Sequence, residues 1–455
     1  MKLAPALSIV AVLGCSQTAP PPTAQAVVYV TTDAPLPPAP GDLPDPLAPA
    51  PLFDRVRIEV FDPDATVPCA GCTRDFAIDA KQVDQGRLSF GVLQRPGVQG
   101  YRVRVRMYRG LAADATGPRP GSSLDTTAEL PAVADGEVQE LGIFLHTDDA
   151  GRPQGTLDHP VAVSAGRLPS GLVGSWPQAK RADCSQPAGD DEVCVPGGAF
   201  WMGDPRLTDL QDWDLQGALE HLVVVSAFYV DRHEVTVADF RASGMAVMQG
   251  GVVKDPVPSG SLDGCTFTLN PGDFEQYAVT CIKWELADAY CRSRGRALPT
   301  EAQFEFLSGA RRSQAFVWGE DPPGCEDAVF ARKDEGALEN GKSCNYLGLG
   351  PAPIGTGLRD RWAGATGEAR DVTAGVGEWM LDAWGPDDGA CWPAGVLKDP
   401  LCQPDSAPDE LARSYRGGHW NAQAGLLRSA IRQYVPDVSK YVLPEVGFRC
   451  SRAAL

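Results

Sequence analysis

The chain of 455 residues contains thirteen cysteines, and the first of them, Cys15, stands apart from the others at the end of an apolar leader. The remaining twelve are an even number, as complete pairing in disulfides requires. Protein disulfides form and persist in oxidising compartments outside the cytosol. We therefore expect an exported protein whose fold is cross-linked at several positions.

Residues 1–15 are typical of a secretory signal that ends in a lipid anchor. Lys2 supplies a positive charge, residues 3–13 are almost entirely apolar, and a glycine precedes Cys15. The segment is too short to span a bilayer as a helix of the mature protein. Its Gly-Cys end resembles a lipobox, in which the cysteine is acylated and becomes the new N-terminus; the alternative is a plain signal peptide with a chance cysteine. We expect lipidation at Cys15 and a place in the cell envelope, and Ser16 favours the outer membrane, facing the periplasm or the exterior.

The net charge argues against two kinds of partner. Forty Lys and Arg residues stand against 59 Asp and Glu residues, which gives a net charge of −19. Such a surface repels the phosphates of nucleic acids and anionic lipid head groups. No later apolar run reaches the roughly 18 residues that a membrane span needs. We expect no nucleic-acid partner, and contact with a membrane through the lipid anchor only.

Composition divides the N-terminal third into two parts. Residues 16–50 are rich in Pro and Ala and are predicted to be a solvated tether, interrupted by one strand-like segment at 26–32. Within 51–150, apolar and charged residues alternate with a period of two, as in 56–60 and 101–108. This alternation is typical of half-buried strands. Several short strands separated by turns favour a small β-sandwich of immunoglobulin-like type.

A Cys-x-x-Cys motif at Cys69 and Cys72 lies within the predicted sandwich. Such a motif can be a redox dithiol or half of a zinc site. Because the sequence offers no second motif and no nearby histidine, a local disulfide is the favoured interpretation. Spacing suggests further local pairs without fixing their connectivity: Cys184 with Cys194, Cys265 with Cys281, Cys325 with Cys344, and Cys391 with Cys402.

The region 194–455 carries a series of sequence blocks rich in Gly, Trp and Arg. It follows a connector, predicted over 151–193 from its Gly, Pro and Ser content. The blocks and their order resemble those of the formylglycine-generating enzyme, or sulfatase-modifying factor, family. They read VPGGAFWMG (195–203), AFYVDRHEVT (227–236), KWELADAYC (283–291), RALPTEAQFE (296–305), VWG (317–319), RGGHWN (416–421) and GFRC (447–450).

The resemblance implies a compact, irregular domain that is poor in regular secondary structure and related to C-type lectins, so the whole chain is expected to be of the α+β class. It also implies a disulfide between Cys291 and Cys450. Closing so long a loop would stabilise the fold by about 4 to 5 kcal/mol on a chain-entropy estimate. Independently of the resemblance, Thr300 and Gln303 form a capping box, so we expect a helix to begin there.

The sequence departs from the family at the catalytic position. Formylglycine generation in the family is a copper-dependent oxidation at two cysteines that follow the RGGSW block. Soft thiolate ligands are needed because they select Cu(I). Here residues 419–427 read HWNAQAGLL and contain no cysteine, so copper is not an expected cofactor. His419 stands in place of the family serine, and Glu445 or Val446 replaces the asparagine before GFRC.

Two oxygen donors keep a calcium site open as a hypothesis. The family's calcium loop resembles 374–379 of this chain, where the asparagine is missing and Glu378 remains. Asn345 corresponds to a second calcium loop. Calcium takes about six to eight oxygen ligands, so these two residues would supply only a small part of a site.

These observations lead to one favoured function and one alternative. We expect an envelope-anchored lipoprotein whose sulfatase-modifying-factor-like domain binds or scaffolds a protein or glycan without catalysis. The alternative is an enzyme: a diverged oxidoreductase of the formylglycine-generating type acting on a protein cysteine, or a new activity centred on His419. In that case His419 with Glu445 would act as acid and base or hold a metal.

Overall fold

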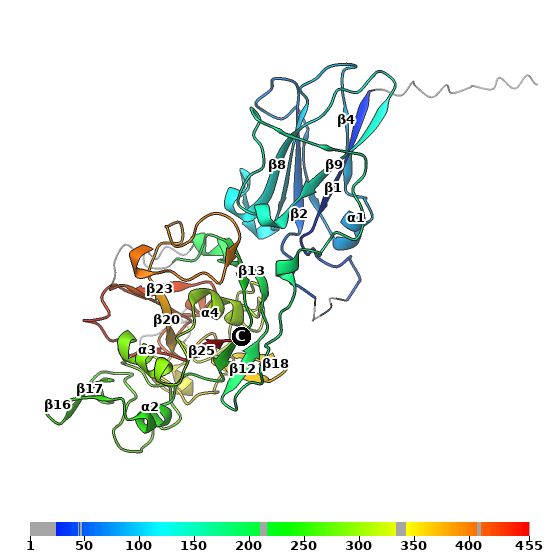
Figure 1. The fold of residues 1–455 in the computed structure, drawn as a ribbon. Coiled ribbons are helices and arrows are strands. Elements are labelled where there is room, and N and C mark those ends of the chain that lie inside the picture. The colour runs from blue at the N-terminus through cyan, green and yellow to red at the C-terminus, as the bar shows by residue number, and fades with distance from the viewer. Residues whose placement is uncertain are drawn as a thin grey trace, which may run out of the picture.

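The computed structural model describes residues 24–43, 45, 48–209, 216–333, 343–406 and 411–454. The predicted signal segment, Cys15 and the first residues of the tether lie outside this part of the chain. Figure 1 shows a body of strands formed by the N-terminal third beside a larger body formed by the rest. Within the described ranges, no helix has the length and apolar character to cross a membrane.

Two sheets make up the N-terminal body (Figure 1). The first has the strand order β11 (Ser164–Ala165), β9 (Val138–Leu145), β1 (Gln25–Thr32) and β4 (Ser89–Leu93). The second has the order β10 (Val161–Ala162), β8 (Ser123–Glu129), β5 (Arg102–Tyr108), β2 (Arg55–Phe61) and β3 (Thr73–Ala77). A short helix, α1 (Ala80–Asp84), and a two-residue strand pair, β6 (Ala113–Asp114) with β7 (Gly117–Pro118), complete this body.

The alternation predicted for β2 and β5 sorts their side chains between the two faces of the second sheet. Val56 and Val103 are buried in a core to which both sheets contribute. Charged residues between them lie on the other face, where Arg57 pairs with Asp75 at 2.8 Å. The period of two therefore positions both strands as expected.

The structure corrects the predicted tether and connector. The strand-like segment expected at 26–32 is strand β1, which runs parallel to β9 over its whole length, so the folded part begins near residue 24. Strands β10 and β11 lie inside 151–193, and each extends one of the two sheets. The buried Trp176 belongs to the same core. The Pro, Ala and Gly content suggested solvated chain. Strand pairing and the burial of one tryptophan nevertheless fix these segments to the folded body.

The C-terminal body consists of short strands, three helices and much irregular chain (Figure 1). Its helices are α2 (Val237–Ser243), α3 (Trp284–Ser293) and α4 (Glu301–Ser308). Three of its sheets have the orders β12 (Glu192–Val195), β15 (Phe228–Asp231), β25 (Ser451–Ala453); β13 (Gly198–Met202), β14 (His221–Val225), β21 (Leu397–Lys398); and β23 (Arg432–Val435), β22 (Arg413–Arg416), β20 (Gly377–Ala383), β24 (Val446–Gly447). Two hairpins pair β16 (Val247–Gln249) with β17 (Val252–Asp255) and β18 (Arg361–Gly364) with β19 (Gly367–Arg370).

The capping box predicted from the sequence begins helix α4. The Thr300 side chain accepts the backbone N–H of Gln303, and the Gln303 side chain accepts that of Thr300. Phe304 and Leu307 are buried against neighbouring strands, so the cap sets which face of the helix enters the core.

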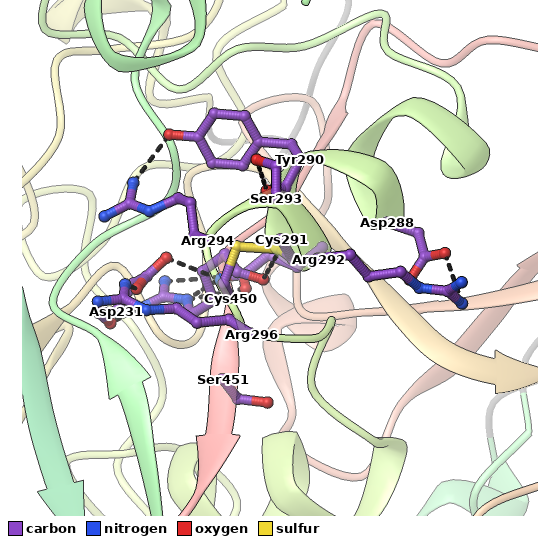
Figure 2. Close-up of a disulfide and its surroundings, with 12 residues drawn as sticks. Asp231, Asp288, Tyr290, Cys291, Arg292, Ser293, Arg294, Arg296, Cys450 and Ser451 are labelled. Carbon is purple, nitrogen blue, oxygen red and sulfur yellow. Dashed lines mark hydrogen bonds and ion pairs between the residues drawn. A yellow bond between two sulfur atoms is a disulfide. The ribbon is translucent and has the colours of Figure 1, made fainter. Parts of the chain in front are cut away.

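The predicted disulfide framework is confirmed, because all twelve cysteines after Cys15 are paired. Five of the bridges close short segments, whereas Cys291–Cys450 joins positions 159 residues apart. Figure 2 shows this bridge between helix α3 and the segment before β25, surrounded by Tyr290, Arg296 and Asp231. Both sulfur-bearing residues are completely buried.

One tryptophan joins the two bodies. Trp201 of β13 is 1 % exposed and belongs to the core that the two N-terminal sheets share. Its ring contacts Phe53 edge-on at 5.7 Å between centroids, and its indole N–H donates to the carbonyl of Leu52 at 2.7 Å. The N-terminal and C-terminal bodies are therefore packed through a common hydrophobic core.

Candidate functional site

His419 lies in a loop that follows β22 and is held by backbone hydrogen bonds. The N–H of Gly418 donates to the carbonyl of Thr373 at 2.8 Å, and the N–H of Trp420 donates to that of Gly375 at 2.9 Å. Gly417 has a φ of 85°, a left-handed conformation that favours glycine. The sequence block RGGHW thus places the histidine by means of glycines and backbone contacts.

The His419 imidazole is buried, and its Nδ1 has no hydrogen-bond partner among the residues that the structure describes. The residue is 8 % exposed. Burial lowers the pKa of His419 to about 4, so the ring is neutral at pH 7. Among the described residues, no carboxylate forms an ion pair with this ring, so the acid–base pair expected from the sequence depends on Glu445.

Glu445 is the carboxylate expected to act with His419. It is half-buried, and burial raises the pKa of its carboxyl group, while the nearby Lys333 lowers it. Among the described residues, no hydrogen bond or ion pair joins Glu445 to His419, and neither group shifts the pKa of the other. Their neighbours are in contact, since the indole N–H of Trp420 donates to the carbonyl of Pro444 at 3.3 Å. A joint role of His419 and Glu445 therefore stays a prediction.

Glu378, the retained calcium candidate, is held by an arginine. The Nε of Arg449 lies 2.8 Å from each carboxylate oxygen of Glu378, and both side chains are buried. A calcium ion at Glu378 would have to displace this guanidinium. Asn345 lies in a short 3-10 turn (Asn345–Leu347), where its backbone N–H donates to Ser343.

The residues present therefore fit neither metal that the family implies. For calcium, Glu378 is already paired with a cation, and the described residues contain no group of three or more His, Cys, Asp or Glu side chains arranged around a metal position. For copper, every described cysteine is in a disulfide, including Cys391 and Cys402, which pair with each other. No thiolate ligands are left for Cu(I) in the described part of the chain.

Four arginines of the C-terminal body form structural ion pairs. Each pairs with a carboxylate from a distant part of the chain: Arg416 with Glu301 and Glu305, Arg428 with Asp204, Arg432 with Glu301, and Arg449 with Glu378. These side chains hold the C-terminal body together rather than leaving charges free for chemistry.

Sequence reasoning missed Asp360, which fixes the loop on which His419 rests. Its carboxylate accepts the N–H groups of Thr373 and Ala374, both at 2.8 Å. Burial, together with the nearby Asp371, raises the pKa of Asp360 to about 8. In the sequence it stands between two arginines, a pattern that suggests an exposed ion pair and gives no sign of this buried role.

Residues 178–454 match the family of the sulfatase-modifying factor enzyme 1-like domain, and the chain belongs to this family. The formylglycine-generating enzyme of Mycobacterium tuberculosis is 25 % identical over 300 residues, which cover 57 % of this chain and 96 % of the relative. The hercynine oxygenase of Mycolicibacterium smegmatis is 26 % identical over 285 residues, covering 56 % of this chain and 60 % of the relative. The inactive C-alpha-formylglycine-generating enzyme 2 of Bos taurus is 28 % identical over 160 residues, covering 28 % of this chain and 52 % of the relative.

Proposed function

We propose that the protein is a non-catalytic binding or scaffolding lipoprotein of the cell envelope. The proposal rests on one observation: the chain offers no free cysteine thiol, among the described residues, at the position where the family has its catalytic pair. Residues 420–428 contain no cysteine, and every cysteine that the structure describes is in a disulfide. The family includes relatives named as oxidative enzymes and one named as inactive, and the missing thiols favour the second kind for this chain.

The position of the protein is part of the same proposal. Cys15 would carry the acyl chains, each buried methylene adding about 0.8 kcal/mol of membrane affinity. The two N-terminal sheets would form an immunoglobulin-like β-sandwich that presents the C-terminal body away from the membrane. A protein or glycan of the envelope would be the partner.

The proposal is tested with a sulfatase-type peptide containing Cys-x-Pro-x-Arg. We expect the purified chain, supplied with copper and oxygen, to leave the peptide thiol unchanged in mass spectrometry, because it offers no thiolate pair to the metal. The formylglycine-generating enzyme of Mycobacterium tuberculosis serves as the positive control. Conversion of the peptide to its formylglycine form by this chain would refute the non-catalytic proposal.

Measurement of the metal content of the purified protein distinguishes the non-catalytic proposal from the alternative in which His419 holds a metal. If the imidazole held a metal, His419→Ala would lower the metal content of the purified protein, whereas the exposed His159→Ala would not. We expect the same metal content in the wild type and in both variants, because His419 has no second ligand beside it among the described residues.

A further inference from the structure

A pocket with a free volume of about 380 Å³ lies in the C-terminal body, and none of its lining residues belongs to the His419 loop. Three segments that are distant in the sequence form it: the end of β15, a loop at 354–355, and strand β19. We call it the Arg232 pocket. Its lining residues are Arg232, His233, Ile354, Gly355, Gly367, Glu368 and Arg370. This volume lies within the range of pockets that bind small molecules.

The Arg232 guanidinium is fixed in place by carbonyl groups rather than by an acid. Its Nε donates to the carbonyl of Asp190 at 2.8 Å, and its Nη2 donates to that of Thr366 at 2.9 Å. No carboxylate pairs with it among the described residues. Its third nitrogen, Nη1, lies against Gly367. The guanidinium is therefore a cation that backbone contacts hold in place.

Two glycines make room for the arginines of this pocket. A Cβ at Gly367 would lie 2.0 Å from Nη1 of Arg232, and the φ of Gly367 is 132°. A Cβ at Gly355 would lie 3.1 Å from Nη1 of Arg370. Any larger residue at Gly367 would clash with the guanidinium of Arg232, so the position of this guanidinium depends on the glycine.

The charges that line the pocket leave one positive charge unbalanced. Arg370 lies 3.5 Å from Glu368, and Arg361 shares the same carboxylate at 3.8 Å. A second acid, the buried Asp371, interacts with Arg370 and His233. Counting Arg232, Arg370 and Arg361 against Glu368 and Asp371, three positive charges face two negative ones. The Nδ1 of His233, another lining residue, contacts the carbonyl of Glu234 at 2.8 Å. A singly charged, planar anion matches this surplus better than a dianion does.

We propose that the Arg232 pocket binds the carboxylate of a small ligand, such as a sugar acid. The carboxylate accepts from Nη1 of Arg232 and from the guanidinium of Arg370, and the remainder of the ligand occupies the free volume beside Ile354. This ligand class deepens the proposed binding function. The ligand class is tested by a binding measurement, whereas the non-catalytic proposal is tested by conversion of the sulfatase-type peptide. Failure of one can therefore be told from failure of the other.

Calorimetric titration of the purified full chain with glucuronate tests the proposal, with glucose as the uncharged probe and inorganic phosphate as the dianion. We expect glucuronate to bind more tightly than either of the others. Arg232→Gln should weaken glucuronate binding by at least about tenfold, because a charge-assisted hydrogen bond is lost. Arg370→Gln, at a side chain that is 50 % exposed, should weaken it in the same direction and keeps the test valid if Arg232→Gln does not fold.

The matched control is Arg292→Gln, which removes one charge from a side chain that is 68 % exposed on helix α3. It should leave glucuronate binding unchanged. Equal binding of glucose, tighter binding of phosphate, or the same affinity in the wild type and in Arg232→Gln would each overturn the assignment. An equal loss of affinity in Arg292→Gln would overturn it as well, because the effect would then come from net charge.

Discussion

Replacing Arg449 with methionine is expected to destabilise the folded protein by about 3 to 5 kcal/mol. The guanidinium is fully buried and donates to Glu378 and to the carbonyls of Arg370 and Asp371. Glu234 lies 3.8 Å away and is buried as well. Methionine fills much of the same volume, but it leaves the buried carboxyl groups of Glu378, Glu234 and Asp371 without a cation.

The pH dependence gives this prediction a second measurement. Burial raises the pKa of Glu234, Asp371 and Glu378, so above the usual carboxyl range the folded state binds more protons than the unfolded state. Their contribution to stability is therefore largest at low pH and is lost as the pH rises through the folded-state values. Without Arg449 these pKa values rise further. The variant should lose stability more steeply than the wild type as the pH rises above the usual carboxyl range.

Urea unfolding at several pH values measures both effects, and Arg292→Met is the control. Arg292 pairs with Asp288 across one helical turn and is largely exposed, so its loss should cost less than about 1 kcal/mol. Equal losses in the two variants would show that the Arg449 cluster does not contribute as a buried ion pair should.

Removing the Cys291–Cys450 bridge by alanine at both positions is expected to lower the free energy of unfolding by about 4 to 5 kcal/mol. The bridge spans 159 residues, and constraining so long a loop in the unfolded chain accounts for most of this effect. Both positions are fully buried, so small cavities add to the loss.

The Cys69–Cys72 bridge provides the comparison for this experiment. It spans only three residues and lies near the protein surface, so its removal should cost less than half as much. Both pairs are measured by urea unfolding without reductant. If removal of the short bridge proved the more damaging, loop entropy could not be the source of the stability.

Local patterns in the sequence predicted the local structure well. The alternation in β2 and β5 and the capping box of α4 depend on residues close in the chain, and both are present. Strand β8 escaped prediction because its buried residues include Asp125, Thr126 and Thr127. Asp125 is buried there because Arg104 of β5 pairs with it, and only the folded sheet reveals that partner.

The candidate site was less predictable for the same physical reason. The motif blocks predicted His419 as a candidate, but the backbone contacts that hold its loop come from residues 332, 373 and 375, far away in the sequence. Arg232 and His233 lie in the family-like block 227–236, but that block does not predict the pocket. The other arginine, Arg370, is 138 positions away, and Arg232 is held by backbone carbonyls that only the fold brings to it. Charges that pair or fail to pair over such separations are properties of the fold.

Trp201 has a consequence for how the molecule responds to stress. This side chain belongs to the C-terminal body but is buried in the hydrophobic core of the N-terminal sheets. Unfolding of either body would therefore expose core residues of the other. Heating should therefore produce one calorimetric peak for both. If the chain were divided at residue 177, the C-terminal fragment would expose the Trp201 side chain to solvent. We expect the separately expressed fragments to aggregate because of this exposed apolar surface.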